Sequence, residues 1–252
     1  MTCDSPAVPQ LDGKREGAWN LPGAEAYAAS CAEIPGWFAP QDFTVFDAIL
    51  AHQLEVDIKG ELLEIGCYYG RSAIMMGYGL RENETLIACD MFENVMGQED
   101  IPIEIRERWL SDVHVDHFYS NWDRYHTRRP DVRMCDSALL DLDRDVLRFS
   151  HIDGSHSYQY VEKDIALVAS HTGSSGVIAM DDYRFVRYPG VARAAWGAVE
   201  RDVLHPFCAT EEKLYATVTP DDQRYWADVM KDLPGAEVYE MPDYDMVVMP
   251  CP

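Results

Sequence analysis

The stretch 61–90, ELLEIGCYYGRSAIMMGYGLRENETLIACD, determines the expected fold. The apolar run at 62–65 is typical of a buried parallel strand. Gly66 and Gly70 bracket a turn in which the backbone can approach a ligand, and the amides of the following helix point at that turn. Asp90 ends the next strand, where a carboxylate can accept both hydroxyls of a ribose. The pattern predicts a site for a nucleoside-containing cofactor, although glycines needed only for packing would look the same.

The glycine spacing narrows the choice of cofactor. A dinucleotide-binding turn has the pattern G-x-G-x-x-G, but Tyr68 and Arg71 stand where its second and third glycines belong. The chain has no G-x-x-x-x-G-K-[ST] segment, which excludes a phosphate-binding P-loop. The turn instead reads E-x-G-x-x-x-G from Glu64 to Gly70, followed by Ser72. NAD and FAD are therefore disfavoured.

Composition restricts the class of protein. The 252 residues, 47% of them apolar, can bury one large α/β domain with a small appendage. The formal charge of −23 repels phosphate backbones and anionic lipids, so we expect neither nucleic acid nor membrane partners. The N-terminal segment lacks the basic and apolar regions of a signal peptide, and seven scattered cysteines without a C-x-x-C pair suit a reducing compartment. We expect a cytoplasmic protein.

Strand and helix patterns alternate along the chain. The expected strands are 62–65, 85–90, 132–135, 147–153, 176–180, 213–219 and 238–249. The expected helices are 23–34, 41–56, 71–80, 103–113, 157–170, 191–203 and 220–233. This alternation predicts a Rossmann-like, doubly wound, mostly parallel seven-stranded sheet with helices on both faces. We expect residues 1–40 to form an irregular and helical N-terminal appendage and residues 41–252 to form the main domain.

Acidic side chains end two further strands. HIDGSH at 151–156 ends one strand with Asp153, and MDDY at 180–183 ends the next with Asp181 and Asp182. If the strands are neighbours, their ends lie about 4.8 Å apart at the ligand-binding edge of the sheet. Three carboxylates there repel one another unless a cation lies between them, and Mg²⁺ with oxygen ligands suits the position. Acids that only cap turns are the alternative.

His156 follows Asp153 by three residues and can face the same edge of the sheet. An imidazole has a pKa suited to taking a proton from a hydroxyl group whose oxygen a metal polarises. A single histidine is also often structural, so its proposed role depends on its lying close to the three acids.

These segments together resemble a known family. LLEIGCYYGRSA at 62–73, HIDGSHSYQYVEKDI at 151–165, GVIAMDDY at 176–183 and YPGVARAAW at 188–196 resemble class I S-adenosylmethionine-dependent methyltransferases. The branch is the one that includes macrocin- and mycinamicin-type sugar O-methyltransferases and cephalosporin hydroxylase-like proteins. The resemblance covers roughly residues 35–195.

The resemblance implies roles for the second group of residues. In the sugar O-methyltransferases of this branch, the matching acids bind Mg²⁺, which implies that Asp153, Asp181 and Asp182 do so here. The histidine of the D-G-x-H segment is the general base, and it corresponds to His156. The first acid of the pair is often Glu in the family, whereas this chain has the shorter Asp181.

The resemblance also implies a cofactor site for S-adenosylmethionine. Glu64, Gly66 and Ser72 would lie along its methionine part, Asp90 would hold the ribose, and Asp136 with Ser137 would border the adenine. An Asp136 that only caps a turn is an equally good interpretation. The complete set of expected cofactor contacts is Glu64, Gly66, Tyr68, Gly70, Ser72, Asp90, Asp136, Ser137 and Asp153.

The expected function is a cytoplasmic O-methyltransferase that uses S-adenosylmethionine and a divalent cation, most simply Mg²⁺. Its acceptor would be a hydroxyl group of a small molecule, such as a sugar or a secondary metabolite. Catechol-type methylation and a cephalosporin hydroxylase-like role are alternatives. A non-catalytic regulatory or assembly protein that binds the cofactor is an alternative of another class. Relatives of this kind are often homo-oligomers, and the N-terminal appendage could supply the contact.

Overall fold

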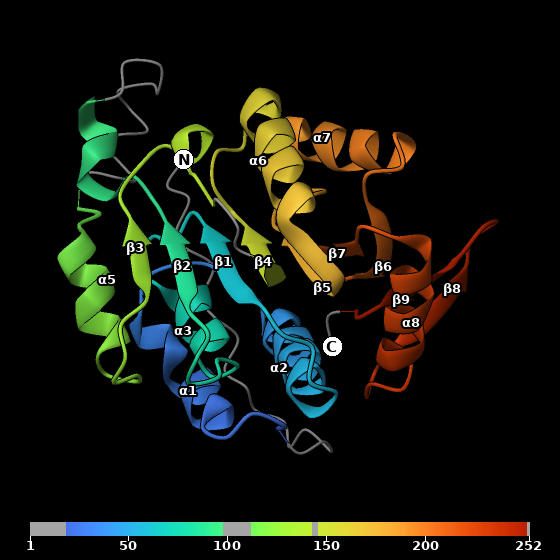
Figure 1. Ribbon diagram of the computed structural model, residues 1–252, viewed down its shortest axis with the longest axis horizontal. Helices are drawn as coiled ribbons and strands as arrows, with labels where there is room; N and C mark the ends of the chain where they lie inside the picture. Colours follow the sequence, from blue (N-terminus) through green and yellow to red (C-terminus); the bar gives the residue numbers. More distant parts are fainter. Residues whose placement is uncertain (1–18, 98–111, 143–145, 251–252) are drawn as a thin grey trace.

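A single sheet organises the molecule in the computed structural model, which describes residues 19–97, 112–142 and 146–250 (Figure 1). Its nine strands have the order β3-β2-β1-β4-β5-β7-β6-β9-β8. The strands are β1 Glu61–Ile65, β2 Leu86–Cys89, β3 Asp131–Arg133, β4 Leu147–Ile152, β5 Thr172–Met180, β6 His205–Ala209, β7 Leu214–Thr217, β8 Glu237–Glu240 and β9 Asp245–Val248.

Helices cover both faces of this sheet. The helices are α1 Ala24–Ser30, α2 Pro40–Glu55, α3 Arg71–Gly77, α5 Val115–Trp122, α6 Tyr158–His171, α7 Pro189–Glu200 and α8 Pro220–Met230, with 3₁₀ turns η1 Cys31–Glu33, η2 Phe92–Gly97 and η4 Ser137–Leu139. In Figure 1, α6 and α7 lie at the top of the view and α1, α2 and α3 at the bottom. No helix within the described ranges is both long and apolar enough to cross a membrane.

The expected doubly wound α/β fold is confirmed, but the strand count of seven was wrong. Strands β1 to β5 are parallel, and β7 is antiparallel to both β5 and β6. The sequence did not predict β6, whose second residue is Pro206. The segment 238–249 is an antiparallel hairpin of β8 and β9 instead of one strand, because Pro242 lies between them and proline interrupts a strand ladder. The helix expected at 103–113 lies almost entirely outside the described residues.

Side chains alternate between two cores on either side of the sheet. Leu62, Phe149 and Ala179 pack with helices α1, α2 and α3, whereas Leu63 and Ile178 pack with α6 and α7. Because successive residues of a strand face opposite sides, this alternation decides which polar side chains share a face. Residues of α1 share the first core with α2. The domain boundary at 40/41 stays a prediction.

The two glycines of the turn after β1 allow other segments of the chain to pack closely against its backbone. Gly66 has φ +85°, and a Cβ added to it would lie 2.0 Å from the carbonyl oxygen of Asp153. Gly70 has φ +90°, and a Cβ there would lie 3.0 Å from the ring of Phe118. Because Gly66 has no side chain, the turn after β1 lies directly against the end of β4. This contact places the predicted cofactor turn beside Asp153.

Replacing Gly66 with alanine should lower the free energy of unfolding by more than about 3 kcal/mol, because a backbone clash adds to a left-handed conformation that costs about 1–3 kcal/mol. Gly235→Ala is the matched control, since Gly235 has φ +82° with no atom within 4 Å of the added Cβ. Urea unfolding of both variants separates conformational strain from the clash. Equal losses in the two variants would show that the contact with Asp153 contributes nothing.

Candidate active site

Asp90 shapes the turn between β1 and α3. Its Oδ2 accepts hydrogen bonds from the backbone amides of Cys67 at 2.7 Å and Tyr68 at 2.8 Å, and its Oδ1 accepts one from the amide of Phe92 at 2.8 Å. These bonds hold Tyr68 at φ +50°, a conformation rare for a bulky residue. Burial raises the pKa of Asp90, and the three backbone amides oppose that shift. Oδ1 accepts only one of these bonds, so it keeps a lone pair for a further donor such as a hydroxyl.

Glu64 contacts a histidine that the sequence did not single out. Its Oε1 lies 2.7 Å from Nδ1 of His151, and both side chains are fully buried. The two residues are direct partners in the parallel pairing of β1 with β4. Glu64 therefore links the predicted cofactor turn to the strand that carries Asp153.

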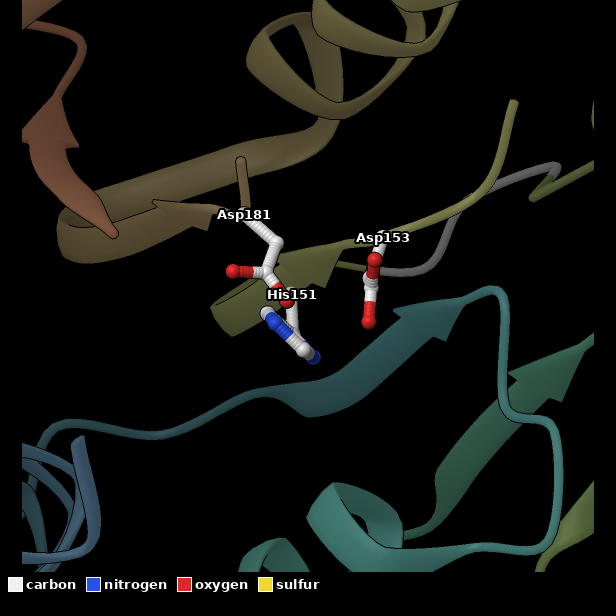
Figure 2. Close-up of side chains that lie close together, drawn as sticks. All are labelled: His151, Asp153 and Asp181. Atoms are coloured by element: carbon white, nitrogen blue, oxygen red, sulfur yellow. The ribbon is translucent and has the colours of Figure 1, made fainter. Parts of the chain in front are cut away.

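The structure brings together in pairs the acids expected to bind metal, and no group of close ligand atoms among the described residues contains all three. The ends of β4 and β5 are neighbours, with Ile152 opposite Met180. Ligand atoms of His151, Asp153 and Asp181 lie within 4.8 Å of one another (Figure 2). Ligand atoms of Asp153, Asp182 and His156 satisfy the same limit. Burial, followed by the neighbouring Asp181, raises the pKa of Asp153 well above its ordinary value.

His156 lies at the outer side of this acid cluster. Its Nε2 is 2.9 Å from Oδ2 of Asp182 and 3.9 Å from Oδ1 of Asp153. Its ring stacks on Tyr188 with ring centroids 4.0 Å apart. Asp182 has φ +54°, and such backbone strain is common where a side chain must be aimed at a functional site. Asp182 and Tyr188 thus fix the position of the imidazole, which stays partly exposed.

Lys213 is a second cluster member that the sequence analysis missed. Its Nζ lies 2.7 Å from Oδ2 of Asp181, and the lysine is buried. Burial disfavours its charge, but Asp181, Asp42 and Asp153 outweigh burial and raise its pKa. The same pair keeps the pKa of Asp181 low despite burial. Lys213 lies here because β7 is antiparallel beside β5, and no sequence pattern indicates that placement.

The cluster has the composition of a cation site. The carboxylates of Asp181, Asp182 and Glu212 also form a group within 4.8 Å of one another, so four acids including Asp153 lie in overlapping groups, and Lys213 forms an ion pair with Asp181. A single ammonium cannot balance four carboxylates, and oxygen ligands in this number suit a divalent cation. The residues present therefore fit the metal that the sequence resemblance implied.

The predicted adenine edge lies at the end of β3. Asp136 Oδ1 accepts a hydrogen bond from the amide of Ala138 at 2.9 Å and so caps η4. Ser137 is hydrogen-bonded to Asp164 of α6, and the other oxygen of that carboxylate, Oδ2, has no partner among the described residues. The capping role of Asp136 is present, and its contact with adenine stays a prediction.

Stability should fall with rising pH because of Asp164. Burial raises its pKa to about 6 in the folded chain, so the folded state holds this proton more tightly than the unfolded state. Deprotonation of Asp164 therefore lowers the free energy of unfolding as pH rises from about 4 to about 6. The free energy of unfolding stays lower by this amount at higher pH. Asp164→Asn should raise the free energy of unfolding at pH 8 by up to about 3 kcal/mol and change little near pH 4. Urea unfolding at both pH values tests this, and a gain of equal size at both would contradict it.

Comparison with known proteins agrees with this geometry. Residues 63–183 match the family model described as a methyltransferase domain. The matched segment, just under half of the chain, is therefore similar to a methyltransferase domain. The resemblance noted from the sequence is thereby confirmed, and the matched range runs from β1 to the end of the acid cluster. No curated protein sequence matches the chain.

The chain is also similar to solved structures, and its likeness to the first of them supports a shared fold. The O-methyltransferase NovP has a TM-score of 0.60 at 18% identity, covering 72% of this chain and 81% of its own. The O-methyltransferase TomG from Streptomyces achromogenes, solved with S-adenosylmethionine, has a TM-score of 0.49 at 16% identity and covers 78% and 89%. CalS11, a calicheamicin methyltransferase, has a TM-score of 0.48 at 14% identity and covers 86% and 98%. At these identities the likeness to NovP concerns the fold alone.

Proposed function

We propose that this protein is an S-adenosylmethionine-dependent O-methyltransferase that requires a divalent cation and acts on a hydroxyl group of a small molecule. The observation that carries the proposal is the meeting of two features at one edge of the sheet. The turn organised by Asp90 lies directly against the strand end that bears Asp153. His156, a residue able to accept a proton, lies beside the same acids.

The chain's own residues supply binding, orientation and proton transfer. S-adenosylmethionine would supply the methyl group, and a divalent cation held by Asp153, Asp181 and Asp182 would lower the pKa of the acceptor hydroxyl. His156 would take the hydroxyl proton, and its Nε2 lies beside Asp182. Holding the acceptor oxygen and the methyl group at attack distance can contribute roughly 7–11 kcal/mol to lowering the barrier.

The nature of the acceptor follows from the resemblance to sugar O-methyltransferases. It favours a sugar or a hydroxylated secondary metabolite, and the O-methyltransferase activity in NovP's name agrees with a hydroxyl acceptor. The strongly acidic chain makes a polyanionic acceptor unfavourable. A cytoplasmic location and a homo-oligomeric state stay predictions.

Transfer of labelled methyl groups from S-adenosylmethionine to a panel of sugars, catechols and hydroxylated metabolites tests the proposal. We expect transfer that stops with EDTA and returns when a divalent cation is added in excess. Transfer that continues unchanged in EDTA would remove the metal from the proposal. Cofactor binding without transfer to any acceptor would favour a non-catalytic cofactor-binding protein, and transfer restricted to catechols would favour the catechol-type alternative.

A further inference from the structure

His151 presents an unused nitrogen to the acid cluster. Its Nδ1 is 2.7 Å from Oε1 of Glu64, and an ionised carboxylate only accepts hydrogen bonds, so the hydrogen of a neutral ring is on Nδ1. Its Nε2 then carries a lone pair. That atom is buried and has no hydrogen-bond partner among the described residues. An unpaired buried polar atom costs about 1–3 kcal/mol, which a bound cation would recover.

The strand geometry places the His151 ring beside the acids. His151 lies in β4 and Asp153 directly follows its end, two residues later, and side chains two apart along an extended chain lie on the same face. Ala179 is the partner of His151 on β5, and its small side chain leaves room beside the ring. Figure 2 shows the imidazole below the carboxylate of Asp181 and to the left of that of Asp153.

We propose that His151 is a nitrogen ligand of the divalent cation, together with Asp153 and Asp181, and that Glu64 orients it. This inference rests on the proposed function and specifies its metal. Metal-binding histidines usually donate their second ring hydrogen to a carboxylate, which is the arrangement of Glu64 and His151. Opposite ligands of an ion with bonds of about 2.1 Å lie about 4.2 Å apart, close to the 4.8 Å limit that these atoms satisfy.

A nitrogen ligand changes which metal the site prefers. Mg²⁺ selects oxygen ligands, whereas imidazole favours transition ions, so the site should prefer Mn²⁺ or Co²⁺ to Mg²⁺. Lys213 does not block the site, because each oxygen of the Asp181 carboxylate has a second lone pair after its hydrogen bond.

Pulsed electron paramagnetic resonance of the Mn²⁺-loaded full-length protein tests the inference. We expect coupling from a directly bound imidazole nitrogen in the wild type and in His156→Gln, and its loss in His151→Gln. His156 is the matched control because it is the other imidazole grouped with these acids. Glu64→Gln should weaken Mn²⁺ binding about 10- to 100-fold while His151 remains in place. Circular dichroism of each variant confirms its fold, and the wild-type and His156→Gln spectra together decide even if His151→Gln does not fold.

The outcomes separate this inference from the proposed function. Bound Mn²⁺ without nitrogen coupling in the wild type would overturn the role of His151 and leave a metal-dependent methyltransferase standing. Coupling that disappears only in His156→Gln would likewise overturn it. A protein that binds neither Mn²⁺ nor Mg²⁺ would overturn the metal requirement of the proposed function together with this inference.

Discussion

Replacing His156 with alanine should lower kcat for methyl transfer by roughly 100- to 10,000-fold, the usual contribution of a general base. The side chain is partly exposed and holds no element of the sheet together, so the loss should concern chemistry and not folding. Its ring lies between Tyr188 and Asp182, beside the acids that would position the acceptor. Affinity for S-adenosylmethionine should stay within about threefold of the wild type, because the cofactor turn is organised by Asp90.

Single-turnover rates and calorimetric binding of S-adenosylmethionine check this result. His171→Ala is the control, because that histidine is the last residue of α6, far along the helix from His156, and its Nδ1 is hydrogen-bonded within the same helix end. An unchanged rate in His156→Ala would refute the proposed base. A large loss of cofactor affinity in the same variant would instead place His156 in the cofactor site.

Replacing Lys213 with methionine should produce the largest loss of stability around the site. Removing one partner of a buried ion pair leaves Asp181 uncompensated beside Asp153, which should lower the free energy of unfolding by about 3–5 kcal/mol in EDTA. A divalent cation bound by the same acids replaces the missing positive charge. Saturating divalent cation should therefore restore a larger share of stability in Lys213→Met than it adds to the wild type.

Arg148→Met is the matched control for this variant. Arg148 is also buried and lies 2.7 Å from an acid, Glu84, but it is at the opposite end of the sheet from the acid cluster. Denaturant unfolding of both variants, with and without divalent cation, gives the comparison. If the cation stabilises Arg148→Met as much as Lys213→Met, then the ion does not bind where Lys213 meets Asp181.

The sequence was most informative where a strand has a distinct apolar run between glycines or acids. Strands β1, β2 and β4 were predicted close to their observed bounds for this reason, and so was the end of β5. In the second half of the sheet, β7 was predicted at 213–219, but β6 was not predicted and β8 with β9 was predicted as one strand, because their signals are weaker. Strand β6 contains Pro206, and all four residues of β8 are exposed, so neither shows the expected alternation of apolar and polar residues.

Some residues of the candidate site could likewise be predicted from the sequence, and others could not. Asp153, Asp181 and Asp182 could be found because each directly follows a recognisable strand. His151 could have been found from its spacing of two residues from Asp153, which puts both on one face. Lys213 could not, because its position depends on a strand that enters antiparallel beside β5.

Strand β8 ends the sheet with an exposed ladder whose first and last residues are Glu237 and Glu240. An open ladder of this kind invites a second chain to extend the sheet. Two copies meeting there antiparallel would bring four glutamates together, and their mutual repulsion opposes that union at neutral pH. Acidification or high salt removes this barrier, so fibrous or sheet-extended aggregates should form first under those conditions.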